Sequence, residues 1–284
     1  AAVKAKDAVV ITGNSTGSGS AVNITSNVTG KSITIAGTST GGYGVGGIGA
    51  LNATAGNVKV DGTSTSNVGT NINNSITATG DVDVTGTSST WHGLFSNGNI
   101  RSTEGTITFV GKNTTSGAGL GMGGNGTMDA KGNIDLTGNS TSYIGISGFG
   151  KLTSTDGNIT LTGTSDQSRG ITFNNLIEAK KGVVNVDAKT NGPTAGMSIV
   201  GTSGIEALSY VVKGKSNTNE GISQDGLMVY KSTSTTTTSL IEGSGGAGVR
   251  IYRGALTINS GDGKATMQSA IGSSGGVYLG SDQN

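Results

Sequence analysis

Apolar residues along this chain alternate with polar ones in short runs that return about every 25 residues, a period typical of repeat architectures. Each copy reads Gly-Asn-φ-x-φ-x-Gly followed by Ser or Thr, where φ is apolar, as in GNVKVDGTSTS at 56–66 and GNITLTGTSDQ at 157–167. The closing glycines are almost evenly spaced along the chain: Gly37, Gly62, Gly86, Gly111, Gly138 and Gly163. A fixed period of this length predicts a solenoid of stacked repeats.

Each period contains three short apolar segments. The first is the alternating strand of the motif, the second follows a Ser/Thr turn and usually opens with glycine, and the third is brief, as in Ile205-Glu206-Ala207. Alternation places the apolar side chains on one face of each strand, and no window of ten or more residues shows a helical period. We therefore predict an all-β fold, a right-handed parallel β-helix (solenoid) with three short strands per coil of about 25 residues and about 11 coils.

The Gly-Asn turn adds a second repeated feature. Stacked amides can bond one coil to the next, and the glycine beside each one suits a backbone φ above zero. This predicts an asparagine stack at Asn57, Asn133 and Asn158. The pattern weakens after Gly214, so we expect one β-helix over 1–284, with regular coils at 1–215 and less regular coils at 216–284. Because the repeat runs close to both ends, we expect a fragment of a longer protein.

Composition excludes several function classes. The chain has 284 residues with 53 glycines, one proline and no cysteine, so disulfides and thiolate zinc sites are excluded. Charged residues make up 12% with a net charge of +1, which lacks a nucleic-acid footprint. No apolar run approaches the roughly 18 residues of a transmembrane helix. We expect no cofactor, no metal, no nucleic-acid partner and no membrane insertion.

The carboxylates do not form a catalytic pair. Glycoside hydrolysis usually needs two carboxylates about 5–10 Å apart on one site. Asp83 and Asp135 share a column but lie two coils, roughly 10 Å, apart with Thr108 between them. Asp61 and Asp187 are five coils apart, and the single histidine gives little support to a Ser-His-Asp triad. We therefore expect no catalytic residues and no enzyme.

The repetition breaks at the residue before the glycine that opens the second strand. Alignment on that glycine compares Tyr43, Val68, His92, Ala118, Ile144, Arg169, Ala195 and Glu220. His92 follows the only tryptophan, Trp91, and Phe95 falls at an outward position of the same strand. Gly121 on the next coil would leave a hollow beside Phe95. The alternative is that Trp91 and Phe95 fold back over the turn and pack locally.

Long side chains nearby complete the candidate ligand site. Tyr43 lies two coils before this turn and Arg169 three coils after it, roughly 10 and 14 Å away. Aromatic faces and an arginine suit a glycan, since arginine grips the carboxylate of an acidic sugar bidentately. The candidate glycan-binding residues are Tyr43, Trp91, His92, Phe95 and Arg169. A second candidate is Arg250, Tyr252 and Arg253, with a solvated edge as the alternative.

The sequon Asn-x-Ser/Thr, a potential N-glycosylation acceptor, is concentrated in the first part of the chain and does not recur after Asn158. It occurs at Asn14, Asn23, Asn27, Asn52, Asn73, Asn113, Asn125, Asn139 and Asn158. An Asn- and Thr-rich repeat also generates such sequons by chance.

The repeats GNVKVDGTSTS, GNIDLTGNSTS and GNITLTGTSDQ, without cysteine and with little charge, resemble the exoproteins of two-partner secretion. The likeness covers essentially the whole chain and is closest to filamentous-haemagglutinin-like, high-molecular-weight adhesins. The resemblance implies a β-helix exported through a dedicated outer-membrane transporter, through a region outside this chain, to the bacterial surface. It also implies binding to sialylated host glycans and hexose modification of sequon asparagines.

The leading hypothesis is therefore a secreted adhesin segment that binds sialylated glycans, without catalysis, as a monomer. One alternative is a structural stalk of an exoprotein or of a contact-dependent toxin. A polysaccharide-acting enzyme is the third interpretation.

Overall fold

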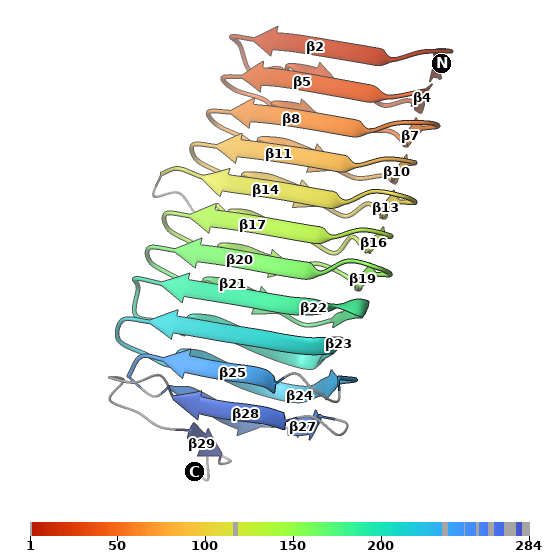
Figure 1. The fold of residues 1–284 in the computed structure, drawn as a ribbon. Coiled ribbons are helices and arrows are strands. Elements are labelled where there is room, and N and C mark those ends of the chain that lie inside the picture. Colours follow the sequence, from red (N-terminus) through yellow and green to blue (C-terminus); the bar gives the residue numbers. More distant parts are fainter. Residues whose placement is uncertain are drawn as a thin grey trace.

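The computed structural model describes residues 2–115, 119–234, 238–246, 248–253, 256–260, 264–269 and 277–279. Within these residues the chain contains no helix and forms a parallel β-solenoid of about ten turns (Figure 1). The all-β parallel solenoid with coils of roughly 25 residues is as the sequence predicted, and the turns number about ten where about 11 were expected.

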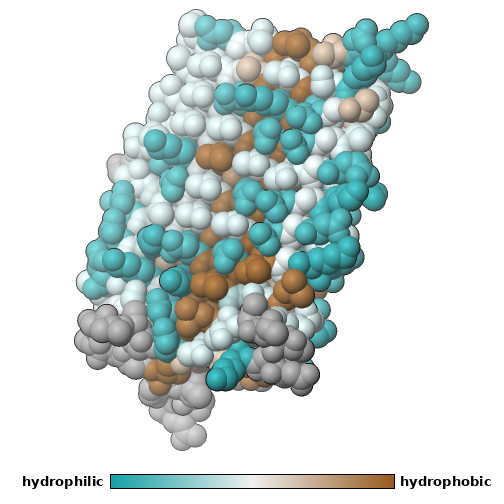
Figure 2. Space-filling view, viewed as in Figure 1, coloured by the Kyte–Doolittle hydropathy of each residue, from teal (hydrophilic) through white to brown (hydrophobic). Residues whose placement is uncertain are grey.

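The motif strands form one continuous ladder. They run parallel and pair residue for residue, so that Ile33, Val58, Val82 and Ile107 form a single column. The ladder comprises β2 (Val9–Ser15), β5 (Ile33–Ser39), β8 (Val58–Ser64), β11 (Val82–Ser88), β14 (Ile107–Asn113), β17 (Ile134–Ser140) and β20 (Ile159–Ser165). Polar side chains cover most of this face, and apolar colour is confined to a band down its middle (Figure 2).

The second and third segments form two shorter ladders. The second-strand ladder comprises β3 (Val22–Asn23), β6 (Val45–Gly46), β9 (Thr70–Ile72), β12 (Leu94–Ser96), β15 (Met122–Gly124), β18 (Ile146–Gly148) and β21 (Ile171–Phe173). The third-strand ladder comprises β1 (Val3–Lys4), β4 (Val28–Gly30), β7 (Leu51–Ala53), β10 (Ile76–Ala78), β13 (Ile100–Ser102), β16 (Met128–Ala130) and β19 (Leu152–Ser154).

From Leu176 the corners straighten and the strands lengthen, earlier than the weakening of the motif after Gly214 suggested. The next strands are β22 (Leu176–Thr190), β23 (Met197–Ser216) and β24 (Ile222–Ser232). Residues 179–183 of β22 lie opposite residues 207–209 of β23. The corner in β23 is therefore two residues shorter than the one in β22, and the backbone of β23 stays extended through it. The last strands are β25 (Thr238–Ser244), β26 (Val249–Arg253), β27 (Leu256–Asn259), β28 (Lys264–Ser269) and β29 (Val277–Leu279).

In the part of the chain after Gly214, the apolar segments at 227–230, 248–251 and 256–258 fall within or largely on β24, β26 and β27. The polar run STSTTTTS at 232–239 begins at the end of β24 and finishes in β25, while residues 235–237 lie outside the described part of the chain.

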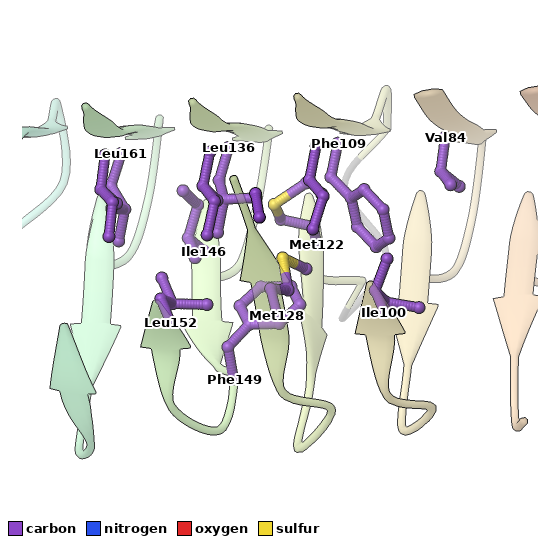
Figure 3. Close-up of a cluster of buried hydrophobic side chains, with 14 of the residues drawn as sticks. Val84, Ile100, Phe109, Met122, Met128, Leu136, Ile146, Phe149, Leu152 and Leu161 are labelled. Atoms are coloured by element: carbon purple, nitrogen blue, oxygen red, sulfur yellow. The ribbon is translucent and has the colours of Figure 1, made fainter. Parts of the chain in front are cut away.

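The core is a set of apolar columns inside the coil. Phe109 and Met122 fill the interior of one coil, and Phe149 reaches the same cluster from a turn (Figure 3). Farther along, Tyr210 and Tyr230 replace smaller residues, are fully buried and lie with ring centroids 5.3 Å apart. Burial raises the pKa of the Tyr230 hydroxyl far above its ordinary value.

Asparagine side chains join successive coils at the turn before the first strand. The Oδ1 atoms of Asn57, Asn133 and Asn158 accept the backbone N–H groups of Asp81, Asn158 and Val183, at 2.9, 2.8 and 2.8 Å. This confirms the predicted bonding from coil to coil. The prediction of positive φ at the adjacent glycines is wrong, because Gly56, Gly132 and Gly157 are not among the residues with positive φ. Where glycine is required here, close approach is the reason: a Cβ on Gly157 would lie 2.5 Å from Asn133 Oδ1.

A second close approach joins the first and second strands of each coil. A Cβ on Gly37 would lie 2.1 Å from the carbonyl oxygen of Gly44, and one on Gly138 would lie 2.2 Å from that of Gly145. We call this contact the glycine seam; it consists of the pairs Gly37–Gly44, Gly62–Gly69, Gly86–Gly93, Gly111–Gly121, Gly138–Gly145 and Gly163–Gly170. In these six coils, backbone contact between the two strands leaves no room for a side chain at the closing glycine, whereas the next copy carries Ala188 in the same column.

We predict that Gly138→Ala destabilises the fold by about 3 kcal/mol, because the new methyl group must push two backbones apart. The denaturation midpoint followed by circular dichroism measures the change. Gly17→Ala is the matched control, since a Cβ there meets nothing within 4 Å. Equal midpoints for the two variants would contradict the role of the seam.

Candidate functional site

The turn that carries Trp91 is fixed from both neighbouring coils. Its backbone N–H donates to Ser88 Oγ at 2.9 Å, and its carbonyl accepts from Asn113 Nδ2 of the following coil at 2.8 Å. Ser88 Oγ in turn donates to the carbonyl of Asn67 in the preceding coil at 2.6 Å. Ser64 and Ser140 make the equivalent bonds elsewhere, and we call this column the capping ladder.

Three aromatic rings stack on this turn. The ring centroids of Trp91 and His92 are 4.8 Å apart, and those of His92 and Phe95 are 5.5 Å apart with an interplanar angle of 22°. We call these residues the aromatic stack. The side chains therefore do pack locally, yet Trp91 keeps 46% of its surface exposed, and His92 and Phe95 are only half-buried. Local packing leaves this aromatic surface accessible to a ligand.

His92 also bonds to the following coil. Its Nδ1 accepts the backbone N–H of Leu120 at 3.0 Å, while the carbonyl of Leu120 accepts the N–H of Gly93 at 3.0 Å. Burial lowers the pKa of His92 from its ordinary value of 6.5.

The backbone register corrects one coil of the sequence alignment. Gly93 N–H bonds to Leu120 and Gly121 N–H bonds to Ile144, so Leu120, and not Ala118, follows His92 in its column. The outward neighbours of Phe95 are Asn71 and Gly123, so Gly123 stands where the sequence alignment had placed Gly121. This coil is longer than its neighbours and offered two glycines, and only Gly121 forms the glycine seam.

A hollow beside Phe95 is present, but Gly123 does not line it, because the Leu120 side chain lies over Gly123. The hollow is an open cavity of about 270 Å³ on the outer face of the second-strand ladder. Its lining comprises Phe95, Leu120, Gly124, Asn125, Ser147, Gly148, Thr172 and Asn174. Aromatic and aliphatic carbon therefore lines one end, and hydroxyl and amide groups line the other.

Unusual backbone geometry shapes the wall of the cavity. Gly124 and Gly148 have φ of 138° and 82°, and Phe149 has φ of 80°, a conformation that non-glycine residues adopt rarely. Its N–H donates to the carbonyl of Gly124 at 2.6 Å, and its own carbonyl accepts from Asn175 Nδ2 at 2.7 Å. Phe149 is buried in the core (Figure 3), which holds the turn in this conformation.

Arg169 does not line the cavity itself. It belongs to the same column as His92, two coils beyond Leu120, and it is exposed. Arg169 precedes Thr172 by three residues, just as Leu120 precedes Gly123. The side chain of Leu120 lies over Gly123. Among the described residues, no carboxylate forms an ion pair with Arg169.

Tyr43 is not part of this cavity. Its ring lies over Gly46, where an added Cβ would be 2.5 Å from Tyr43 Cδ2. Val68 and Asn71 of the intervening coil separate it from Phe95, on the side opposite the cavity. Of the five predicted residues, only Phe95 lines the cavity; His92 contacts its wall through Leu120, and Trp91 packs on His92.

The alignment of the repeats within the chain did not identify Tyr143 as a candidate. Tyr143 occupies the same turn position as Trp91, two coils farther on, and is 45% exposed. Both N–H groups bond to the capping serine three residues earlier, Ser88 for Trp91 and Ser140 for Tyr143. Gly119 lies between them, so the two aromatic side chains flank a coil without a side chain at this position. Aligning the residue two places before the strand-opening glycine would have found it.

In the second candidate site, the charge of Arg250 is largely balanced by a neighbouring carboxylate. Arg250 lies 3.4 Å from Glu220, whose side chain is only 6% exposed, so its charge is engaged in an ion pair. Tyr252 and Arg253 belong to β26, and their side chains lie outside the described residues. Arg250 does share the outward column of the second strands with Ser198 and Ser223.

The sequon asparagines differ in exposure. Asn14, Asn23, Asn27, Asn52, Asn73, Asn125 and Asn158 are exposed, and Asn139 is half-buried. Asn113 is buried in the capping ladder, so the folded chain does not present it as an acceptor. Asn125 also lines the cavity.

The acidic residues lie where the repeat placed them. Asp83 pairs with Thr108, which pairs with Asp135, so the two carboxylates are separated by a full coil. The described residues include no group of three or more His, Asp or Glu side chains arranged to hold a metal ion. They also include no helix long and apolar enough to cross a membrane.

No known protein family, curated protein or solved structure matches the chain. The geometry of the cavity and the sequence pattern are therefore the basis for its function.

We predict that Asn113→Ala frees the carbonyl of Trp91 and costs about 1 kcal/mol of stability. The single tryptophan should then show lower fluorescence anisotropy at a temperature where the fold is intact. Ser216→Ala is the matched control, because Ser216 makes the same capping bond to Thr194 far from Trp91. Unchanged anisotropy in Asn113→Ala, or an equal change in the control, would contradict the clamp.

Proposed function

We propose that this chain is a non-catalytic segment of a bacterial adhesin that binds sialylated host glycans in the cavity between Phe95 and Arg169. The carrying observation is the arrangement of that cavity. Phe95 of the aromatic stack lines one end, hydroxyl and amide groups line the rest, and the exposed Arg169, without a described carboxylate partner, stands three residues before Thr172 of the other end.

This arrangement suits an acidic sugar. The apolar C–H face of a pyranose packs on an aromatic ring, and its hydroxyl groups bond to side chains such as Ser147 and Asn174. A carboxylate matches the paired N–H groups of arginine. The Oγ1 atom of Thr172 is buried with no hydrogen-bond partner among the described residues, and rotation of this cavity-lining side chain would present it to a ligand hydroxyl.

The ligand would lie along the solenoid axis. Phe95, Gly123, Ser147 and Thr172 are successive members of one column, so the cavity spans about three coil spacings, roughly 14 Å. That length fits a short oligosaccharide, with its acidic residue at Arg169 and its next sugar toward Phe95. Trp91 and Tyr143 flank this path and could contact a longer glycan.

The resemblance to two-partner-secretion adhesins supports this proposal and supplies its setting. It favours a secreted protein at the bacterial cell surface, exported by an outer-membrane transporter, monomeric, and in contact with host glycoproteins. The separated carboxylates Asp83 and Asp135 favour binding without hydrolysis.

We predict that Arg169→Ala weakens binding of sialyllactose at least tenfold, because a charge-assisted contact is lost. Isothermal titration calorimetry measures the affinity, and lactose should bind wild type and Arg169→Ala equally weakly. Arg101→Ala is the matched control, since Arg101 is exposed on the third-strand ladder and ion-paired with Asp129. Sialyllactose binding that survives in both Arg169→Ala and Phe95→Ala would remove the site.

A structural stalk is the second candidate, favoured by the unbroken ladders that join every coil (Figure 1). A stalk predicts that the isolated chain does not attach to host cells. Attachment of the labelled chain to epithelial cells, and its loss after sialidase treatment, is the outcome expected of the adhesin. Absence of attachment would favour the stalk.

A further inference from the structure

His92 lies between the aromatic stack and a wall of the cavity. Its Nδ1 is 3.0 Å from the backbone nitrogen of Leu120, and Leu120 lines the cavity. The next bond along the same pair of coils joins Gly93 N–H to the carbonyl of Leu120. Leu120 is thus held at its N–H by a side chain and at its carbonyl by the backbone.

The side-chain bond depends on the protonation state of the ring. A neutral imidazole accepts at one nitrogen and donates at the other, whereas an imidazolium donates at both. A proton on Nδ1 would point at the N–H of Leu120, and two donors cannot bond to each other. Protonation therefore breaks this contact between the coils.

We propose that His92 is a positioning residue of the glycan site: neutral His92 fixes the Leu120 wall of the cavity through Nδ1, and protonated His92 releases that wall and weakens binding. This inference rests on the proposed glycan site, although the hydrogen bond can be tested without any ligand.

No neighbouring acid stabilises a charged His92. The turn of its own coil and those of the two adjacent coils, 64–69, 88–93 and 113–121, contain no other titratable side chain. The outward neighbours of Phe95, Asn71 and Gly123, do not titrate either. The cations are Lys112 of β14, which is exposed and whose backbone approaches Gly93, and Arg169, three coils away.

Burial sets the direction of the pH dependence. It lowers the pKa of His92 in the folded chain below 6.5, so on acidification the unfolded chain takes up a proton before the folded one. The stabilisation from neutral His92 is therefore fully present above about pH 6.5 and is lost as the pH falls through the folded pKa. Sialyllactose binding should weaken over the same range.

Two substitutions test the hydrogen-bond acceptor of His92 and its aromatic ring separately. His92→Asn places Oδ1 where Nδ1 lies, and so keeps an acceptor for Leu120 that does not titrate. His92→Phe keeps an aromatic ring against Trp91 and Phe95 but removes the acceptor. The single histidine and the Leu120 amide are followed by NMR between about pH 7.5 and 5, alongside calorimetric titration with sialyllactose.

In wild type, the Leu120 amide shift should follow the titration of His92, with a midpoint below about pH 6.5. Sialyllactose affinity should fall about fivefold to tenfold in parallel, as expected for one lost hydrogen bond. His92→Asn should keep Leu120 protected from hydrogen exchange and make the affinity independent of pH. His92→Phe should lose that protection and bind weakly at every pH.

A Leu120 amide that does not respond to the titration of His92 would overturn the proposal, as would an unchanged pH dependence in His92→Asn. If sialyllactose binds at no pH while the Leu120 amide still follows His92, the glycan ligand fails and the His92–Leu120 link stands.

Discussion

The fold depends on the contact between two backbones at the glycine seam. In the six coils of the seam, a methyl group on the first-strand glycine would overlap the carbonyl of the second-strand glycine, and one on the second-strand glycine would overlap the first strand of the following coil. No side chain fits at this corner, because the two glycine backbones close it by direct contact. The side chains that point into the coil fill the rest of its cross-section. The apolar columns, the capping ladder and the outward positions of the second strand all take their places from that contact.

Close packing of the coil restricts function to its outer surface. Nearly every Val, Ile and Leu of the motif is committed to the interior, and the seam and the turns commit the glycines. The side chains that remain to meet a ligand project from the turn before the second strand and from the outward face of that strand. The aromatic stack and the cavity are found there, with Phe95 and Leu120 at one end of the cavity and Ser147 and Thr172 farther along the same face.

Much of this architecture could be predicted from the sequence, because period and alternation specify a parallel stack almost by themselves. The outward register of one coil could not. The segment before Met122 contains Gly119 and Gly121, and only the backbone contact with Gly111 shows that Gly121 opens the second strand. The error displaced Leu120 from the column of His92 and hid the bond between them. Tyr43 was included in the site because column spacing gives only the distance between coils along the solenoid axis. That spacing does not predict the direction of the side chain, and the ring of Tyr43 packs onto Gly46 of its own coil.

The parallel ladders give the rod a particular response to force. Hydrogen bonds between coils run along the solenoid axis, so an axial pull acts on them in the direction in which they open. Each coil contacts only its neighbours, and coils would therefore detach singly from an end, each releasing about 25 residues or roughly 80 Å of chain. A rod built this way extends by steps under load, while coils still bonded on both sides keep their shape and whatever ligand they hold.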